Sequence, residues 1–249
     1  WQTADRIELV ANENYFDGKP YISRYIYRII PDQSVQFMEM MSGGVDSMEL
    51  TSELWTTRAE TEKFKKNFNK FKITEFNYVY FGFNLNNELF KDKKIRKAIN
   101  YAINKDEIIQ GVKKGLAVRT SGPYIPGTWA YNDSDDVEKY DYNPETAKKL
   151  LSEAGWQMEN DGFIHKQGKK FEFTIVTNQG NKEREEIATI IQQQLSKIGI
   201  KAEVRILAWN ILLTEFIDKK KFDAVVMGWS TGLDPDNYDI WHSSKNKEG

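Results

Sequence analysis

The chain has 249 residues, of which 40% are apolar and 13% aromatic, so it can fold as one large domain or two modest ones. Its 35 Lys and Arg against 37 Asp and Glu leave a formal charge of −2, which argues against a nucleic-acid partner, since such proteins usually carry a net basic face. The absence of cysteine excludes disulfides and thiolate chemistry, and no apolar run approaches the ~18 residues of a membrane-spanning helix.

The first seventy residues predict strands and helices in an order unlike the rest of the chain. The predicted strands are 6–13, 21–30 and 45–50, and the predicted helices are 33–42 and 57–69. Asp32 is expected to cap the first helix, which ends before Gly43. We expect a domain junction at 70–76, where basic polar residues give way to an alternating aromatic strand that places Phe76, Tyr78 and Tyr80 on one face.

From residue 76 onward, strands and helices alternate. The predicted strands are 76–86, 171–177, 200–207 and 222–229, and the predicted helices are 92–104, one capped by Asn104, 143–155, 182–198 and about 209–218. Glu107 stands where a capping box requires an acid. Alternating strands and helices predict parallel pairing, and in such sheets ligands bind beyond the carboxyl ends of the strands. The loops after residues 177 and 228 are therefore expected to meet at a binding site.

The stretch "FDAVVMGWSTGLDPDNYDIWHS" (222–243) allows two interpretations. Gly228, Ser230 and Gly232 form G-x-S-x-G, the turn that presents a hydrolase serine after a strand. An acid and a base are also available nearby, among Asp234, Asp236, Asp239 and His242. Alternatively, the small residues beside Trp229 form a turn that lines a ligand cleft and performs no chemistry.

The ligand-facing turn is the better interpretation of the two. Pro235 and the aspartates around it predict a turn where a hydrolase needs a helix, and too few residues follow Asp239 for the later strands that carry the acid and histidine of that fold. The rival hypothesis is a serine hydrolase that uses Ser230, His242 and a nearby aspartate.

Metal sites are not predicted. Counted from Asp234, an EF-hand loop would need an oxygen ligand at Tyr238 and a glutamate at Lys245. The acidic segment "NDSDD" (132–136) is expected to be a solvated loop, with calcium as the alternative, and His165 lies far along the chain from His242. We therefore expect no metal, no cofactor and no catalytic residue.

Several long motifs carry a resemblance to a known family. The segments "YVYFGFNLNNELFKDKKIRKAINYAINKDEII", "YNPETAKKLLSEAGW" and "NKEREEIATIIQQQLSKIGIKAEV" resemble the extracellular solute-binding proteins of family 5, the oligopeptide-, dipeptide- and nickel-binding receptors of ABC importers. The front segment "DRIELVANENYFDGKPYISRYIYRIIPDQSVQFMEMMSGGVDSMEL" is similar to the same family. The resemblance covers essentially the whole chain and implies a protein that is longer at both ends.

This resemblance implies a periplasmic-binding-protein-like α/β fold with a mixed, largely parallel sheet flanked by helices, plus a partial second lobe. Residues 1–70 would belong to the first lobe and residues 71–249 to an incomplete second lobe, and the two lobes would close on a peptide or another small solute. In the family, the Gly-Trp turn lines the ligand. The expected ligand-binding residues are Gly228, Trp229, Ser230, Thr231, Asp234, Asn178 and Gly180.

One position departs from the family pattern. Peptide-binding members commonly have an aspartate three residues after the tryptophan, where this chain has Gly232. Either Asp234 binds the ligand's amino group from a shifted loop, or the receptor does not bind a free amino terminus. The resemblance also implies a monomer outside the cytoplasm that acts with membrane permease subunits, in the periplasm or lipid-anchored, with its signal or anchor segment not in this chain.

Overall fold

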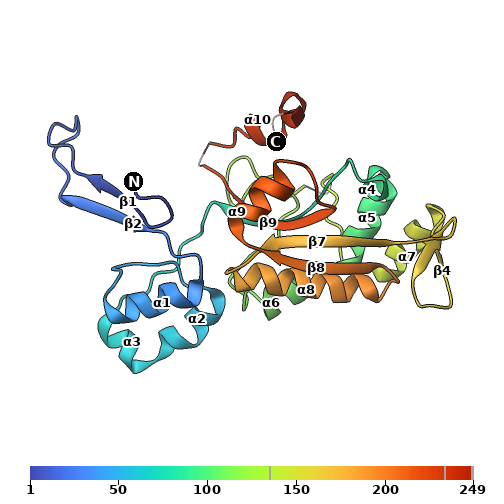
Figure 1. The fold of residues 1–249 in the computed structure, drawn as a ribbon, viewed down its shortest axis with the longest axis horizontal. Helices are drawn as coiled ribbons and strands as arrows, with labels where there is room; N and C mark the ends of the chain where they lie inside the picture. Colours follow the sequence, from blue (N-terminus) through green and yellow to red (C-terminus); the bar gives the residue numbers. More distant parts are fainter. Residues whose placement is uncertain (135, 233, 248–249) are drawn as a thin grey trace. The chain divides into compact units, whose positions relative to one another are not determined.

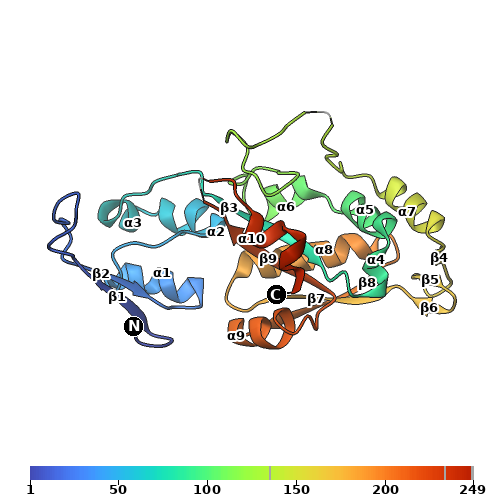
Figure 2. The same cartoon turned by 90° about the horizontal axis from the view of Figure 1, so that it is seen from above.

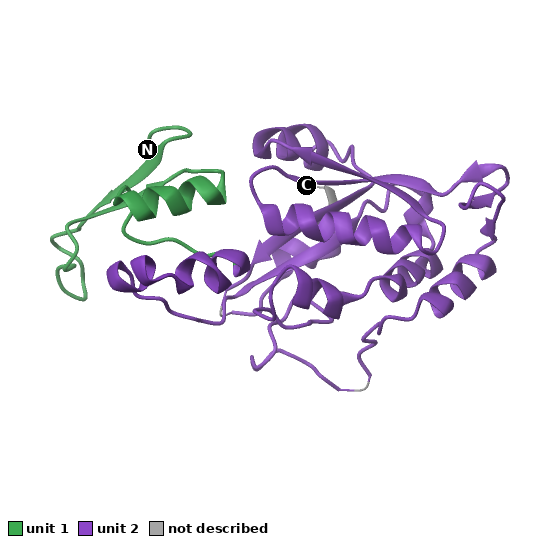
Figure 3. Ribbon diagram, turned by 90° about the horizontal axis from the view of Figure 1, so that it is seen from below, with its two compact units in different colours: residues 1–51 green, residues 52–249 purple. Residues whose placement is uncertain are grey.

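The structure, a computed structural model, describes residues 1–134, 136–232 and 234–247 (Figure 1). The chain forms two compact units, Trp1–Thr51 and Ser52–Gly249, which are described separately (Figure 3). This division is one of packing, and the lobe boundary predicted at 70–76 stays a prediction.

The first unit contains an antiparallel strand pair and a helix. β1 (Arg6–Val10) pairs with β2 (Arg24–Arg28), and both are shorter than predicted. α1 (Gln33–Ser42) has the predicted bounds, because the Asp32 carboxylate accepts hydrogen bonds from the first-turn amides and Gly43 ends the helix at φ 81°. The strand predicted at 45–50 was wrong, since these residues pair with no strand and remain irregular.

The second unit opens with a broken helical segment. The structure has α2 (Ser52–Thr56), a 3₁₀ turn (Arg58–Glu60) and α3 (Glu62–Asn67) in place of one helix over 57–69. The helix begins earlier than predicted and is interrupted at Thr57, whose φ and ψ of −120° and −80° are not helical. Thr61 then caps α3 through its hydroxyl oxygen.

A four-stranded mixed sheet forms the centre of this unit. Its strands are β3 (Asn77–Phe83), β7 (Glu172–Asn178), β8 (Lys201–Leu207) and β9 (Ala224–Ser230), in the order β3-β9-β7-β8. β7 is parallel to both β8 and β9, whereas β3 is antiparallel to β9. The predicted α/β class and the mixed, largely parallel sheet are confirmed. A small three-stranded sheet of β4 (Gln157–Met158), β5 (Ile164–Lys166) and β6 (Lys169–Lys170) lies apart from it.

The helices cover both faces of the large sheet. They are α4 (Glu88–Lys91), α5 (Lys93–Ala102), α6 (Lys105–Gly111), α7 (Pro144–Glu153), α8 (Lys182–Ser196) and α9 (Trp209–Ile211), then a π-helical segment (Leu212–Ile217), α10 (Tyr238–Trp241) and a 3₁₀ turn (Ser243–Lys247). α5 and α7 pack side by side (Figure 2). The helix predicted at 209–218 has the right extent, but most of it winds as a π-helix.

Two apolar cores lie on opposite faces of the sheet. The larger one joins α5, α7 and α8 to one face, and Ile99, Leu151 and Leu195 are among its fully buried side chains. The smaller core joins the π-helical segment to the other face through Leu212 and Met227. No helix in the described part of the chain is both long and apolar enough to span a membrane.

Only the Asn104 half of the predicted capping box at α6 is formed. Asn104 caps the helix as predicted, accepting from the Glu107 amide at 3.1 Å. The Glu107 carboxylate, however, does not return to the Asn104 amide. The buried Gln194 side chain bridges them, since its Oε1 accepts from the Asn104 amide and its Nε2 donates to Glu107 Oε2, both at 2.9 Å. A residue 87 positions away thus completes the cap, which local sequence could not indicate.

Candidate ligand-binding site

The predicted meeting point of two loops is formed at one edge of the large sheet. Because β7 and β9 are parallel, with Val176 opposite Val225, their last residues Asn178 and Ser230 lie at the same edge. β3 runs in the opposite direction, so its first residue, Asn77, pairs with Ser230. This carboxyl edge is where ligands bind in open α/β sheets.

Arg184 joins the start of α8 to this edge. Its backbone amide donates to the side chain of Asn181, the N-cap of α8, at 3.0 Å. Its guanidinium donates to Asn178 Oδ1 at 2.9 Å. A Cβ atom on Gly228 would lie only 2.9 Å from Arg184 Nη2 and 3.0 Å from the Tyr78 carbonyl oxygen. Only glycine admits this approach, so Asn178 and Gly228 lie around the same guanidinium, as the edge geometry predicted.

Aromatic residues form the other side of the edge. Trp229 is 41% exposed at the carboxyl end of β9 and lies directly opposite Tyr78 in the ladder. Burial raises the pKa of Tyr80, while the Arg184 charge and the Trp229 indole lower it. Burial also raises the pKa of Tyr78, with the Trp241 indole of α10 acting in the opposite direction. Both phenols therefore stay neutral at physiological pH.

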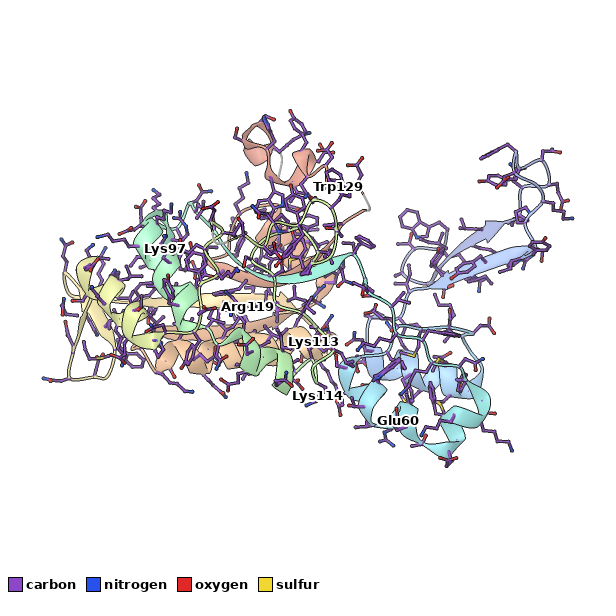
Figure 4. All side chains as sticks on the ribbon, turned by 180° about the vertical axis from the view of Figure 1, so that it is seen from behind. Glu60, Lys97, Lys113, Lys114, Arg119 and Trp129 are labelled. Atoms are coloured by element: carbon purple, nitrogen blue, oxygen red, sulfur yellow. The ribbon has the colours of Figure 1, made fainter. Side chains whose placement is uncertain are left out.

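A shallow depression continues from the turn after β9. Thr231 closes the turn, because its amide and hydroxyl donate to the Phe76 carbonyl oxygen at 2.6 and 3.2 Å. The depression encloses about 20 Å³, which is room for about one water-sized group. The residues that line it are Phe76, Pro123, Tyr124, Ile125, Thr128, Trp129, Ala130, Thr231, Gly232, Pro235 and Asn237. Trp129 is 83% exposed and offers an apolar surface at its rim (Figure 4).

The remaining predicted residues differ in their exposure and in their hydrogen bonds. Ser230 is exposed at the end of β9. Gly180 has φ 88°, which favours glycine, and its amide donates to Glu185 Oε1 at 3.1 Å. Asp234 is exposed, and its Oδ1 accepts from the Asp236 amide at 3.0 Å. One oxygen of Asp234 is thus committed to the loop, and its role toward a ligand stays a prediction.

The geometry does not support a serine hydrolase. No helix follows Ser230 directly, since α10 begins only at Tyr238. His242 Nδ1 lies 2.8 Å from the Ser244 hydroxyl, and its ring stacks on Tyr238 at 4.4 Å between centroids. The histidine required as a base for Ser230 is therefore engaged with other residues.

The metal alternatives gain no support either. Within residues 1–134, 136–232 and 234–247, no three histidine or acidic side chains gather as metal ligands would. Asp135, part of the 132–136 loop, lies outside the described residues. His165 is held by Asp161, with Nε2 3.1 Å from Oδ2.

Arg184 was missed by the sequence analysis. One signal was present: an arginine in the first turn of a predicted helix faces the positive end of the helix dipole, which disfavours cations. Such a position needs a compensating reason, and here the reason is the contact with Asn178 and Gly228.

The fold and this edge define a class: an α/β domain with exposed aromatic and polar groups at the carboxyl edge of a mixed sheet. Comparison with known sequences identifies the family. The pattern of the bacterial extracellular solute-binding proteins, family 5, middle part, matches residues 1–249, and the chain belongs to this family.

Individual relatives agree. The oligopeptide-binding protein AppA of Bacillus subtilis is 41% identical over 254 residues, which is 100% of this chain and 46% of AppA. Its solved structure in complex with a nonapeptide matches with a TM-score of 0.87 at 39% identity, covering 99% of this chain and 48% of that one. The structure of NikZ from Campylobacter jejuni with Ni(L-His) matches with a TM-score of 0.88 at 29% identity, covering 100% of this chain and 48% of NikZ.

These comparisons bear on both hypotheses from the sequence. The chain spans about half the length of the relatives it matches. The periplasmic-binding-protein-like fold is confirmed, and the relatives are named as binding proteins, so the comparisons give no support to the serine hydrolase.

Proposed function

We propose that this chain is part of the substrate-binding component of an ABC importer, which captures oligopeptides or dipeptides and performs no catalysis. The observation that carries the proposal is the match of the whole chain, in sequence and fold, to a receptor solved with a nonapeptide. The carboxyl edge supports it, because exposed aromatic surface beside a few fixed polar groups suits a peptide better than a single small ion.

Within this proposal, Gly228 and Trp229 line the ligand, and Ser230, Thr231 and Asp234 continue the lining along the turn after β9. Asn178 and Gly180 border the same cleft from the β7 side. Gly228 leaves room for the Arg184 guanidinium beside the strand, and Trp229 offers ring surface to a ligand side chain. The lobe assignment, with residues 1–70 in the first lobe and 71–249 in the second, belongs to the same proposal.

The cellular setting follows from the family. Its description as extracellular supports a place outside the cytoplasm, where a monomer would deliver peptide to permease subunits in the membrane. The proposal allows two locations: the protein is anchored to the membrane by a lipid, or it is free in the periplasm.

The test is to purify the full-length protein from its native host and identify bound solutes by mass spectrometry. Co-purified peptides, displaced by denaturation and rebound in calorimetry, are the expected result. Recovery of a metal chelate or haem in place of peptides would overturn the substrate assignment. Turnover of activated esters that is lost in Ser230→Ala would overturn the proposal as a whole.

A further inference from the structure

Glu183 lies in the first turn of α8, beside Arg184, and is shared by three elements. Its Oε1 accepts from the backbone amide of Ser52, the first residue of α2, at 2.8 Å. Its Oε2 forms an ion pair with Lys113, which follows α6 (Figure 4). The side chain is only 17% exposed and Ser52 only 6%, so these contacts are largely withdrawn from water.

An acid at this position is also expected for helix stability alone, because carboxylates favour the positive end of the dipole. The neighbouring Glu186 serves as the comparison. It is exposed, and its side chain forms no hydrogen bond or ion pair with another described residue. Of these two glutamates, only Glu183 contacts two other elements. Its contacts therefore indicate a role beyond stabilising the helix dipole.

We propose that Glu183 is a positioning residue that fixes the candidate binding site relative to residues 52–67, an inference that rests on the proposed function. The connection is short. Glu183 holds Ser52 and Lys113 on one side, and the next residue, Arg184, holds Asn178 and lies against Gly228 on the other. A displacement of the first turn of α8 therefore reaches the end of β9, which carries Trp229, through one side chain.

Electrostatics give the connection its strength. The Lys113 ammonium and the Ser52 groups lower the pKa of Glu183 against the opposing effect of burial. The carboxylate thus stays ionised in a place where an unpaired charge would be costly. Removal of Lys113 leaves the Glu183 carboxylate without its counter-charge, and removal of Glu183 leaves the Ser52 amide without its acceptor. We therefore expect either change to displace the first turn of α8.

The experiment uses four variants of the full-length protein. Glu183→Ala removes both contacts, and Glu183→Gln keeps an acceptor for the Ser52 amide but removes the charge. Lys113→Met removes the opposite charge, and Glu186→Gln is the control with the same charge change. Calorimetry with a pool of synthetic dipeptides and nonapeptides measures affinity, urea unfolding measures stability, and hydrogen exchange of the 228–231 amides in the peptide-free protein measures the site directly.

We expect about tenfold weaker peptide binding in Glu183→Ala, a smaller loss in Glu183→Gln, and no change in Glu186→Gln. Glu183→Gln and Lys113→Met should combine non-additively, because they remove the same ion pair. Exchange at 228–231 should rise with the loss of affinity. A loss of stability with affinity and exchange unchanged overturns the inference, since a purely structural role predicts that pattern.

The two proposals fail separately. If the unsubstituted protein binds no peptide, the proposed function fails, and the exchange measurement alone decides the role of Glu183. Faster exchange at 228–231 in Glu183→Ala than in Glu186→Gln then supports the positioning role, and equal exchange overturns it.

Discussion

Gly228→Ala tests the packing of the candidate site. The new Cβ would lie 2.9 Å from Arg184 Nη2 and 3.0 Å from the Tyr78 carbonyl oxygen, so the guanidinium must move, and we expect this movement to break its 2.9 Å hydrogen bond to Asn178. Asn178 is 9% exposed, and leaving its carbonyl oxygen without a donor costs ~1–3 kcal/mol. Alanine regains up to ~1 kcal/mol over glycine in a strand, so we expect a net loss of about 1–2 kcal/mol.

Urea unfolding followed by tryptophan fluorescence measures this loss. With a slope of ~2 kcal/mol/M, the midpoint should fall by roughly 0.5–1 M without a change of slope. Gly232→Ala is the matched control, because its Cβ would meet nothing nearer than the Asp234 amide nitrogen at 3.7 Å. A Gly228→Ala protein as stable as the Gly232→Ala protein would refute the close approach of Arg184.

Three further outcomes are expected. Gln194→Leu leaves the Asn104 amide without its acceptor and should lower the free energy of unfolding by about 1–3 kcal/mol, measured in urea; an unchanged midpoint would contradict the bridged cap. Asp161, whose pKa is lowered to about 2 chiefly by Lys170, stabilises the fold at neutral pH and loses this effect as the pH falls from about 4 toward 2; NMR titration should show its pKa rising in Lys170→Met, and no rise would exclude the ion pair. Phe90→Ala should cost about 3–5 kcal/mol, because this fully buried ring packs on two other phenylalanines, and a loss below ~1 kcal/mol in urea would contradict that packing.

Elements with local start and stop signals were predictable from the sequence. α7 has Asn143 as its cap, Pro144 in its first turn and Gly155 at φ 88° after its end, and its bounds agree with the prediction. The same holds for α1 and for the start of α8, where Asp32 or Asn181 precedes the helix as its cap, although α8 ends at Ser196, two residues before the predicted end. In each case the information lies within a few residues of the boundary.

Features set by distant contacts were not predictable. The segment 45–50 pairs with no strand, and the segment Leu212–Ile217, which packs against the sheet, winds as a π-helix. The position of Arg184 depends on Asn178 and on the lack of a side chain at Gly228, 44 residues later in the sequence. The sequence indicated this edge of the sheet through Trp229, but it did not indicate Arg184, which contacts both Asn178 and Gly228.

The first turn of α8 explains how this edge tolerates a cation at a helix start. A positive charge there costs about 0.3–1 kcal/mol against the dipole. Two glutamates offset this cost from the same turn: Glu183 accepts from Ser52 and pairs with Lys113, and Glu185 accepts from the Gly180 amide. Arg184 is thereby directed toward Gly228 while its acidic neighbours bind other elements. Arg184 of α8 thus packs against β9 at Gly228, and the next residue, Trp229, keeps 41% of its surface exposed.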